Sequence, residues 1–181
     1  MGCDISVHCE YRKDGVWYNC DNFEWDQEYG RYEFSSIYWY RNYELFGVLA
    51  GVRDISYGTI SEPKGLPEDI SPKTKELADE WKGDAHSYSY LTMRELLRWK
   101  EIKTQRWKKL KKKYKVTHDE SEGDFIYNEK DNVLMYKREK TILDTLIKRM
   151  KTKMCDHVYI FEEDDYWNKG DDFRIVFWFD S

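Results

Sequence analysis

The two ends of the chain place the strongest constraint on its fold, because both alternate with the period of a β-strand. In residues 3–12 and again in residues 173–180, every second side chain is apolar, aromatic or a cysteine. Such alternation is typical of strands that bury one face. The face of the last strand that we expect to be apolar carries Phe173, Ile175, Phe177 and Phe179. We therefore predict that both termini lie in one sheet.

The dipeptide Asp14-Gly15 follows the first strand and is a strong signal for a two-residue hairpin turn. A loop of that length determines how the returning strand, residues 16–20, is aligned with the first. The predicted pairs are Lys13 with Val16, Arg12 with Trp17, Tyr11 with Tyr18, and Cys9 with Cys20. Opposed cysteines can form a disulfide when oxidised, but in a reducing cytosol we interpret both as buried thiols.

Periodic apolar residues and capping residues predict the helices of the middle of the chain. Asn42 is placed to cap a helix that Gly51 ends. Thr92 and Glu95 have the spacing of a capping box, in which each side chain binds the backbone of the other. The predicted helices cover residues 42–51, 71–83, 93–113 and 133–153.

The segments between these helices are predicted to be mostly irregular. Residues 21–41 are expected to form an excursion with one short strand around 34–40, and residues 84–91 a short loop between helices. A second hairpin is predicted at the C-terminus, from residues 157–162 and 172–180 with an acidic turn between them.

Hairpins at both ends with helices between them predict an α+β fold. We expect a mainly antiparallel sheet formed by the N- and C-terminal hairpins and packed against several helices. The 181 residues are expected to form a single domain, 1–181, from which the helices at 93–113 and 133–153 protrude as a helical hairpin. No apolar stretch approaches the length of a membrane span, so we expect no membrane association and a cytoplasmic location.

Five sequence blocks carry a resemblance to known proteins. They are MGCDI at residues 1–5, RNYELFGVLAGVR at 41–53, GLPEDIS at 65–71, GDAHSYSYL at 83–91 and RIVFWFD at 174–180. These blocks resemble a family of small bacteriophage and prophage proteins that begin MGCDIH. The resemblance implies a phage origin, the bacterial host cytosol and an accessory role, with no activity or cofactor to carry over. Ser6 stands where the family usually has its first His, and Tyr88 stands where the family often has a second His. These two differences argue against a metal site built on those histidines.

Aromatic residues and arginines are concentrated in the first third of the chain and suggest a nucleotide site. A base stacks on an aromatic ring, and a phosphate accepts two hydrogen bonds from a guanidinium group. The candidate ligand-binding residues in this part of the chain are Trp39, Arg41, Tyr43 and Arg53. The alternative is that these side chains form an aromatic core or a protein interface.

A polar cluster, Asp84, His86 and Ser87, lies between two predicted helices and completes the candidate ligand-binding set. Asp84 and His86 could also act as acid and base of a small hydrolase or nuclease. A metal-assisted version of that enzyme would use Asp4, His8, His86 and Asp180 as ligands. The alternative is structural: Asp84 and Ser87 cap the next helix, and no metal-ligand spacing is present.

Charge is strongly segregated along the chain. Between Arg94 and Lys115 there are eleven Lys or Arg and two Glu, although the whole chain has a formal net charge of −5. This basic segment, 94–115, could contact nucleic acid phosphates, or it could be a solvated helix face.

These observations favour a non-enzymatic phage accessory protein that counters host defence or adjusts host physiology. Its expected partner is a nucleotide-derived signal that it sequesters, or a host protein, and homo-oligomerisation is a further hypothesis. No phosphate loop, dinucleotide glycine pattern or nucleophile elbow occurs in the sequence, and we expect no cofactor. A hydrolase or nuclease that uses Asp84 and His86 is the alternative function.

Overall fold

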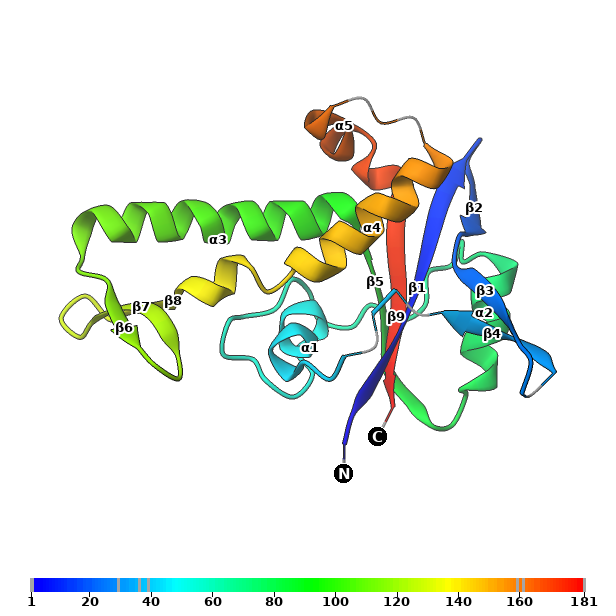
Figure 1. The fold of residues 1–181 in the computed structure, drawn as a ribbon, viewed down its shortest axis with the longest axis horizontal. Helices are drawn as coiled ribbons and strands as arrows, with labels where there is room; N and C mark the ends of the chain where they lie inside the picture. Colours follow the sequence, from blue (N-terminus) through cyan, green and yellow to red (C-terminus); the bar gives the residue numbers. More distant parts are fainter. Residues whose placement is uncertain are drawn as a thin grey trace.

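A four-stranded antiparallel sheet forms the centre of the computed structural model, which describes residues 2–28, 30–35, 37–38, 40–158, 160 and 162–180. The strand order is β2-β1-β9-β5 (Figure 1). Its strands are β1 (Asp4–Lys13), β2 (Val16–Asn19), β9 (Phe173–Asp180) and β5 (Ala85–Thr92). The chain therefore has the predicted α+β fold with both termini in one sheet.

The predicted N-terminal hairpin is confirmed down to its residue pairs. Lys13 lies opposite Val16 and Tyr11 opposite Tyr18, and the amide of Cys20 donates to the carbonyl of Cys9 over 2.9 Å. Asp14 and Gly15 both have positive φ, as the tight turn requires. Cys9 and Cys20 are buried free thiols.

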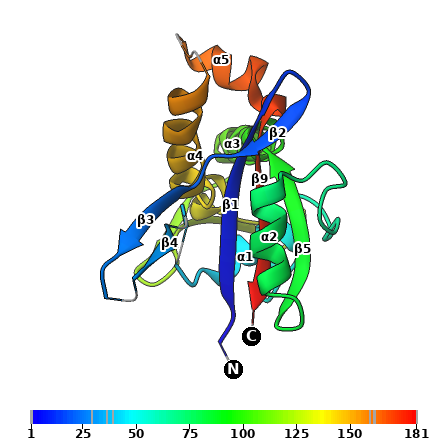
Figure 2. The ribbon, with the colours of Figure 1, turned by 90° about the vertical axis from the view of Figure 1, so that its right-hand side faces the viewer.

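Strand β9 has two different faces, and helices cover both. Its odd-numbered residues, Phe173 to Phe179, belong to the main core together with apolar residues of α1 (Tyr43–Ala50), α3 (Met93–Lys113) and α4 (Asp144–His157). Val176 and Trp178, on the other face, pack under α2 (Pro72–Glu80). Figure 2 shows α2 in front of β9, with its axis roughly along the strands. Coverage on both sides explains why the strand is buried along almost its entire length.

The predicted capping residues of three helices act as expected. The Asn42 side chain accepts from the amide of Leu45, and Gly51 ends α1 with a φ of 68°. Ser71 caps α2. The Thr92–Glu95 capping box begins α3, which ends at Lys113 as predicted. These signals succeed because each depends only on contacts within one helical turn.

Four sequence predictions need correction. Residues 84–91 are largely strand β5 and not a loop. Residues 21–41 contain a hairpin, β3 (Asn22–Asp26) with β4 (Arg31–Ser35). The predicted C-terminal hairpin is wrong, because α5 (Glu163–Asn168) and a short 3-10 helix, η2 (Gly170–Asp172), precede β9. The helix predicted from residue 133 begins only at Asp144.

The segment before α4 belongs to a projecting arm. Strands β6 (Thr117–Asp119), β7 (Gly123–Asn128) and β8 (Val133–Tyr136) form a small sheet beside the C-terminal half of α3, followed by η1 (Lys137–Lys140). Trp107, Ile126 and Met135 form a separate small core there. Figure 1 shows this arm extending sideways from the central sheet. The arm thus pairs α3 with a sheet, where the sequence predicted a second helix.

Candidate functional site

Both predicted ligand-binding arginines, Arg41 and Arg53, lie near Tyr43, at the end of the central sheet where the two termini lie (Figure 1). The guanidinium carbon of Arg53 lies 5.8 Å from the centre of the Tyr43 ring, and the Tyr43 hydroxyl accepts from the Cys3 amide at 3.4 Å. Arg53 is exposed and has a positive φ of 70°. The fourth predicted residue, Trp39, lies outside the described residues.

The guanidinium group of Arg41 is already occupied by a carboxylate. Its Nε and Nη2 atoms each lie 2.6 Å from an oxygen of Asp4. This hydrogen bonding, more than the charge of Arg41, holds the pKa of Asp4 below its usual value. A phosphate could form paired hydrogen bonds with Nε and Nη2 of Arg41 only by displacing Asp4.

The predicted cluster of Asp84, His86 and Ser87 lies at the start of an edge strand. His86 Nδ1 is 2.9 Å from Ser87 Oγ, and Ser87 has a φ of 54° at an irregularity in the pairing of β5 with β9. Within the described part of the chain, no hydrogen bond joins Asp84 to His86. The capping alternative is also wrong, because Thr92 caps α3.

The four alternative metal ligands are not brought together. Asp4 binds Arg41, and His8 Nδ1 lies 3.0 Å from Asp21 Oδ2. The Asp180 side chain accepts a hydrogen bond from the backbone amide of Asp4. The His86 ring lies 6.1 Å from the ring of Phe179, which is on the face of β9 opposite to Asp180. Among the described residues, no group of three or more His, Cys, Asp or Glu side chains is arranged to hold a metal ion.

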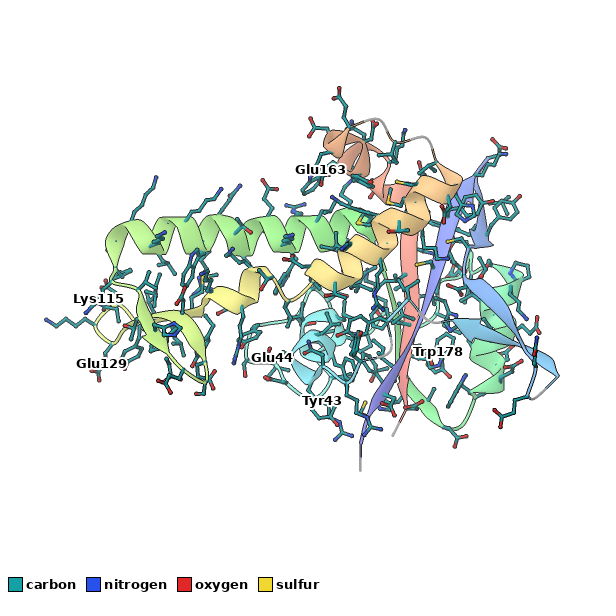
Figure 3. The ribbon with its side chains drawn as sticks, in the orientation of Figure 1. Tyr43, Glu44, Lys115, Glu129, Glu163 and Trp178 are labelled. Atoms are coloured by element: carbon teal, nitrogen blue, oxygen red, sulfur yellow. The ribbon has the colours of Figure 1, made fainter. Side chains whose placement is uncertain are left out.

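Ser6 and Tyr88 both lie beside Trp178. Ser6 is opposite Trp178 in the sheet, and the Tyr88 ring centre is 5.6 Å from that of Trp178. Figure 3 shows Trp178 beside the central sheet. His8 stacks on the same indole at 4.5 Å. Trp178 is completely buried, so this chain places a packed aromatic cluster between the two positions.

The lysines of α3 that face the rest of the protein are neutralised. Lys100 Nζ is 2.6 Å from Asp144, and Lys103 Nζ is 2.9 Å from Glu139 in a mostly buried pair. Lys113 pairs with Asp131 at 3.1 Å. These three belong to the segment predicted to contact phosphates, but they tie the helix to its own fold.

A cavity that the sequence analysis missed lies between α3, α4 and α5. Its volume is about 390 Å³, within the range typical of small-molecule sites. Three ammonium groups and several hydroxyl or thiol groups line it. The lining residues are Lys100, Asp144, Ile147, Lys148, Lys151, Thr152, Cys155 and Tyr166.

The three cavity lysines differ in how they are held. Lys100 pairs with Asp144, and Lys151 pairs with Glu163 while its Nζ lies 4.3 Å from the centre of the Tyr166 ring. Figure 3 shows Glu163 on α5. Lys148 is exposed and, among the described residues, has no acidic partner. Its ammonium group is therefore available to an anionic ligand.

Tyr166 contributes a neutral hydroxyl group to the cavity. Its oxygen is 3.3 Å from Cys155 Sγ. This hydrogen bond, followed by burial, raises the pKa of Tyr166 to about 12. The phenol therefore stays protonated at physiological pH and can donate a hydrogen bond.

No single sequence motif could have identified this cavity, because its residues come from three helices that are far apart in the chain. The sequence pattern of residues 163–168 does not indicate α5, so it gives no reason to place Tyr166 beside α4. The only available signal was the helical spacing of Lys148, Lys151 and Cys155, which places them on one side of α4.

No family model matches the chain, and no curated protein or solved structure matches it significantly. The candidate sites therefore rest on their own geometry. In the described part of the chain, no helix is both long and apolar enough to cross a membrane.

Proposed function

We propose that this protein is a non-enzymatic binder of a small phosphate-bearing ligand, and that the cavity between α3, α4 and α5 holds it. The observation that carries the proposal is the presence of three lysines around one open cavity with only one carboxylate in its lining, that of Asp144. Hydrogen bonds between an ammonium group and a phosphate are about twice as strong as neutral ones.

Each part of the cavity has a role in this proposal. Lys148 binds the phosphate directly, because its ammonium group has no acidic partner among the described residues. Lys151 adds a second positive charge when the phosphate competes with Glu163, an exposed carboxylate. The hydroxyl group of Tyr166 donates to a remaining ligand oxygen, since Cys155 Sγ can be the donor in their own contact. The Thr152 hydroxyl already donates to the carbonyl of Lys148 and can only accept from the ligand.

A nucleotide is the ligand class that best fits these groups and the cavity volume. Its phosphates suit the lysines, and Tyr166 and Ile147 supply the apolar contacts that a base or ribose needs. In the biological setting that we propose, a bacteriophage accessory protein in the host cytosol would use the site to sequester a nucleotide-derived signal. A host protein as the partner, and hydrolysis by Asp84 and His86, stay alternative predictions.

We expect Lys148→Ala to weaken nucleotide binding about tenfold or more, because a hydrogen bond to a charged group contributes roughly 1.5–3 kcal/mol. Calorimetric titration should use inorganic phosphate, AMP, ATP, a cyclic dinucleotide and, as a carboxylate control, citrate. The melting temperature should be unchanged, since the Lys148 side chain makes no hydrogen bond or ion pair with the part of the chain that the structure describes.

Lys82→Ala is the matched control, because Lys82 is also exposed and without an acidic partner among the described residues, but lies beside α2. It should leave the affinity unaltered. If Arg41→Ala abolished binding while Lys148→Ala did not, the ligand would bind at the terminal end of the sheet. Chromatography of the titrated nucleotides tests the enzyme alternative, which predicts a hydrolysed product that disappears in His86→Ala.

A further inference from the structure

The outer face of α3 carries basic side chains that the fold itself does not use. Those that are exposed and make no ion pair within the described part of the chain are Arg98, Arg106, Lys108, Lys109, Lys111 and Lys112. Figure 3 shows side chains reaching from this helix away from the rest of the molecule. The basic face is defined here as Arg98, Arg106, Lys108, Lys109 and Lys112.

Folding accounts for the inward lysines of α3 but not for the basic face. Asp144 and Glu139 each pair with an inward lysine of this helix, and Asp131 pairs with the exposed Lys113. The chain has five more acidic than basic residues, as its formal charge of −5 records, yet none of its described acids pairs with the basic face. A positively charged surface on an otherwise acidic protein attracts a negatively charged partner to that surface.

Stabilisation of the helix end explains only part of this charge. Cations near a helix C-terminus interact favourably with its dipole, but the effect fades beyond the last turn. In α3 that turn contains Lys111, Lys112 and Lys113. Arg98, Arg106 and Lys108 lie too far toward the N-terminus to benefit.

The composition of the basic face favours a nucleic acid over a protein partner. Centres of protein interfaces are depleted in charged residues and enriched in apolar and aromatic ones. Ile102, which is 55% exposed, is the one large apolar side chain that α3 exposes strongly. The face therefore suits a partner that is recognised through its charges.

The position of the aromatic residues favours a duplex over a single strand. Binding of single strands depends on exposed aromatic rings on which bases stack. Trp107 is only 6% exposed and is packed against the arm's own core, and Trp99 packs against the main core. From Arg98 to Lys112 the helix extends about 21 Å at 1.5 Å per residue, along which a DNA duplex presents many phosphates.

We propose that the basic face of α3 binds the phosphate backbone of double-stranded nucleic acid without reading its sequence. The projecting arm holds the helix straight and away from the acidic body of the protein, so that several phosphates are contacted together. This site is separate from the α3–α4–α5 cavity and does not depend on the function proposed for it.

The test is fluorescence anisotropy of the full chain with two unrelated 20-base-pair duplexes at salt concentrations from 50 to 200 mM. We expect similar affinity for both duplexes and a linear fall of log K with log salt. The double variant Lys109→Ala/Lys112→Ala should bind at least tenfold more weakly at 50 mM salt. Its salt slope should decrease by about 0.9 for each lost phosphate contact.

The control is Lys13→Ala/Lys82→Ala, which removes the same charge from exposed positions outside the arm. Circular dichroism should show equal helix content in both variants. The proposal is overturned if both variants weaken binding equally, if neither duplex binds at 50 mM salt, or if polyglutamate competes as well as duplex does.

Discussion

Replacing Arg174 by alanine is expected to destabilise the protein by about 3–5 kcal/mol, because the change leaves a buried carboxylate without its partner. Arg174 Nε donates to Glu10 Oε2 at 2.7 Å, and the side chain of Glu10 is completely inaccessible to solvent. Arg174 itself is 3% exposed. Such a loss corresponds to a fall in Tm of roughly 6–20 °C for a chain of this size.

Arg174 also binds Asp69, in the loop before α2, and so holds that loop against the central sheet. Its Nη1 donates to Asp69 Oδ1 at 2.7 Å, and its guanidinium carbon lies 3.9 Å from the centre of the Trp17 ring. Trp17 donates its indole N–H to the same carboxylate. Burial disfavours the ionised form of Asp69, but the hydrogen bond and charge of Arg174 still hold its pKa below the usual value. Removing the arginine therefore removes the contacts that join β9 to Glu10 of β1, to Trp17 of β2 and to Asp69 in the loop before α2.

Chemical denaturation of Arg174→Ala and of Arg12→Ala measures this effect against a matched control. Arg12 pairs with Asp172 on the surface, where both side chains are more than 40% exposed, so its loss should cost less than about 1 kcal/mol. The double variant Glu10→Met/Arg174→Met should lose less than Arg174→Ala, because it leaves no uncompensated charge. Equal losses for the two arginines would contradict this account.

Gly47→Ala is expected to destabilise the protein by about 3 kcal/mol or more, although alanine is the better helix former. Gly47 lies inside α1, where helix propensity alone predicts a gain of roughly 0.5–1 kcal/mol. An added Cβ atom would lie 1.2 Å from the carbonyl oxygen of Asp54, which belongs to the backbone. Because backbone cannot rotate away as a side chain can, α1 and the segment around Asp54 must separate.

Denaturant titration shows directly whether Gly47→Ala lowers or raises the free energy of unfolding. Gly15→Ala is the control that measures the cost of backbone strain without a steric clash. Gly15 has a φ of 82° but no atom within 4 Å of an added Cβ, so only the cost of a left-handed alanine, roughly 1–2 kcal/mol, should appear. Stabilisation of the Gly47→Ala variant would show that the close approach of Asp54 to α1 is wrong.

Much of the fold could be predicted because its signals are local. The Asp14-Gly15 turn determines the register of β1 and β2, and the caps at Asn42, Ser71 and Thr92 mark where helices begin. Each of these signals acts through contacts between residues only a few positions apart.

The segments that were predicted wrongly take their structure from distant partners. Residues 85–92 do not alternate clearly, but they form β5 because β9 offers an open edge for them to pair with. Residues 133–136 have an apolar pattern that suits a helix, yet β7 binds them as β8. In both cases hydrogen bonds across the sheet decide the outcome, in keeping with the strong dependence of strand formation on context.

The candidate sites show the same division between sequence and tertiary structure. The sequence alone identified the basic character of α3, because charge is a property of the residues themselves. Only the tertiary structure showed which of its lysines are neutralised, and only it brought Lys100, Lys148 and Tyr166 together around one cavity. The physical reason is that a binding site depends on distances between side chains, and the packing of α3, α4 and α5 sets those distances.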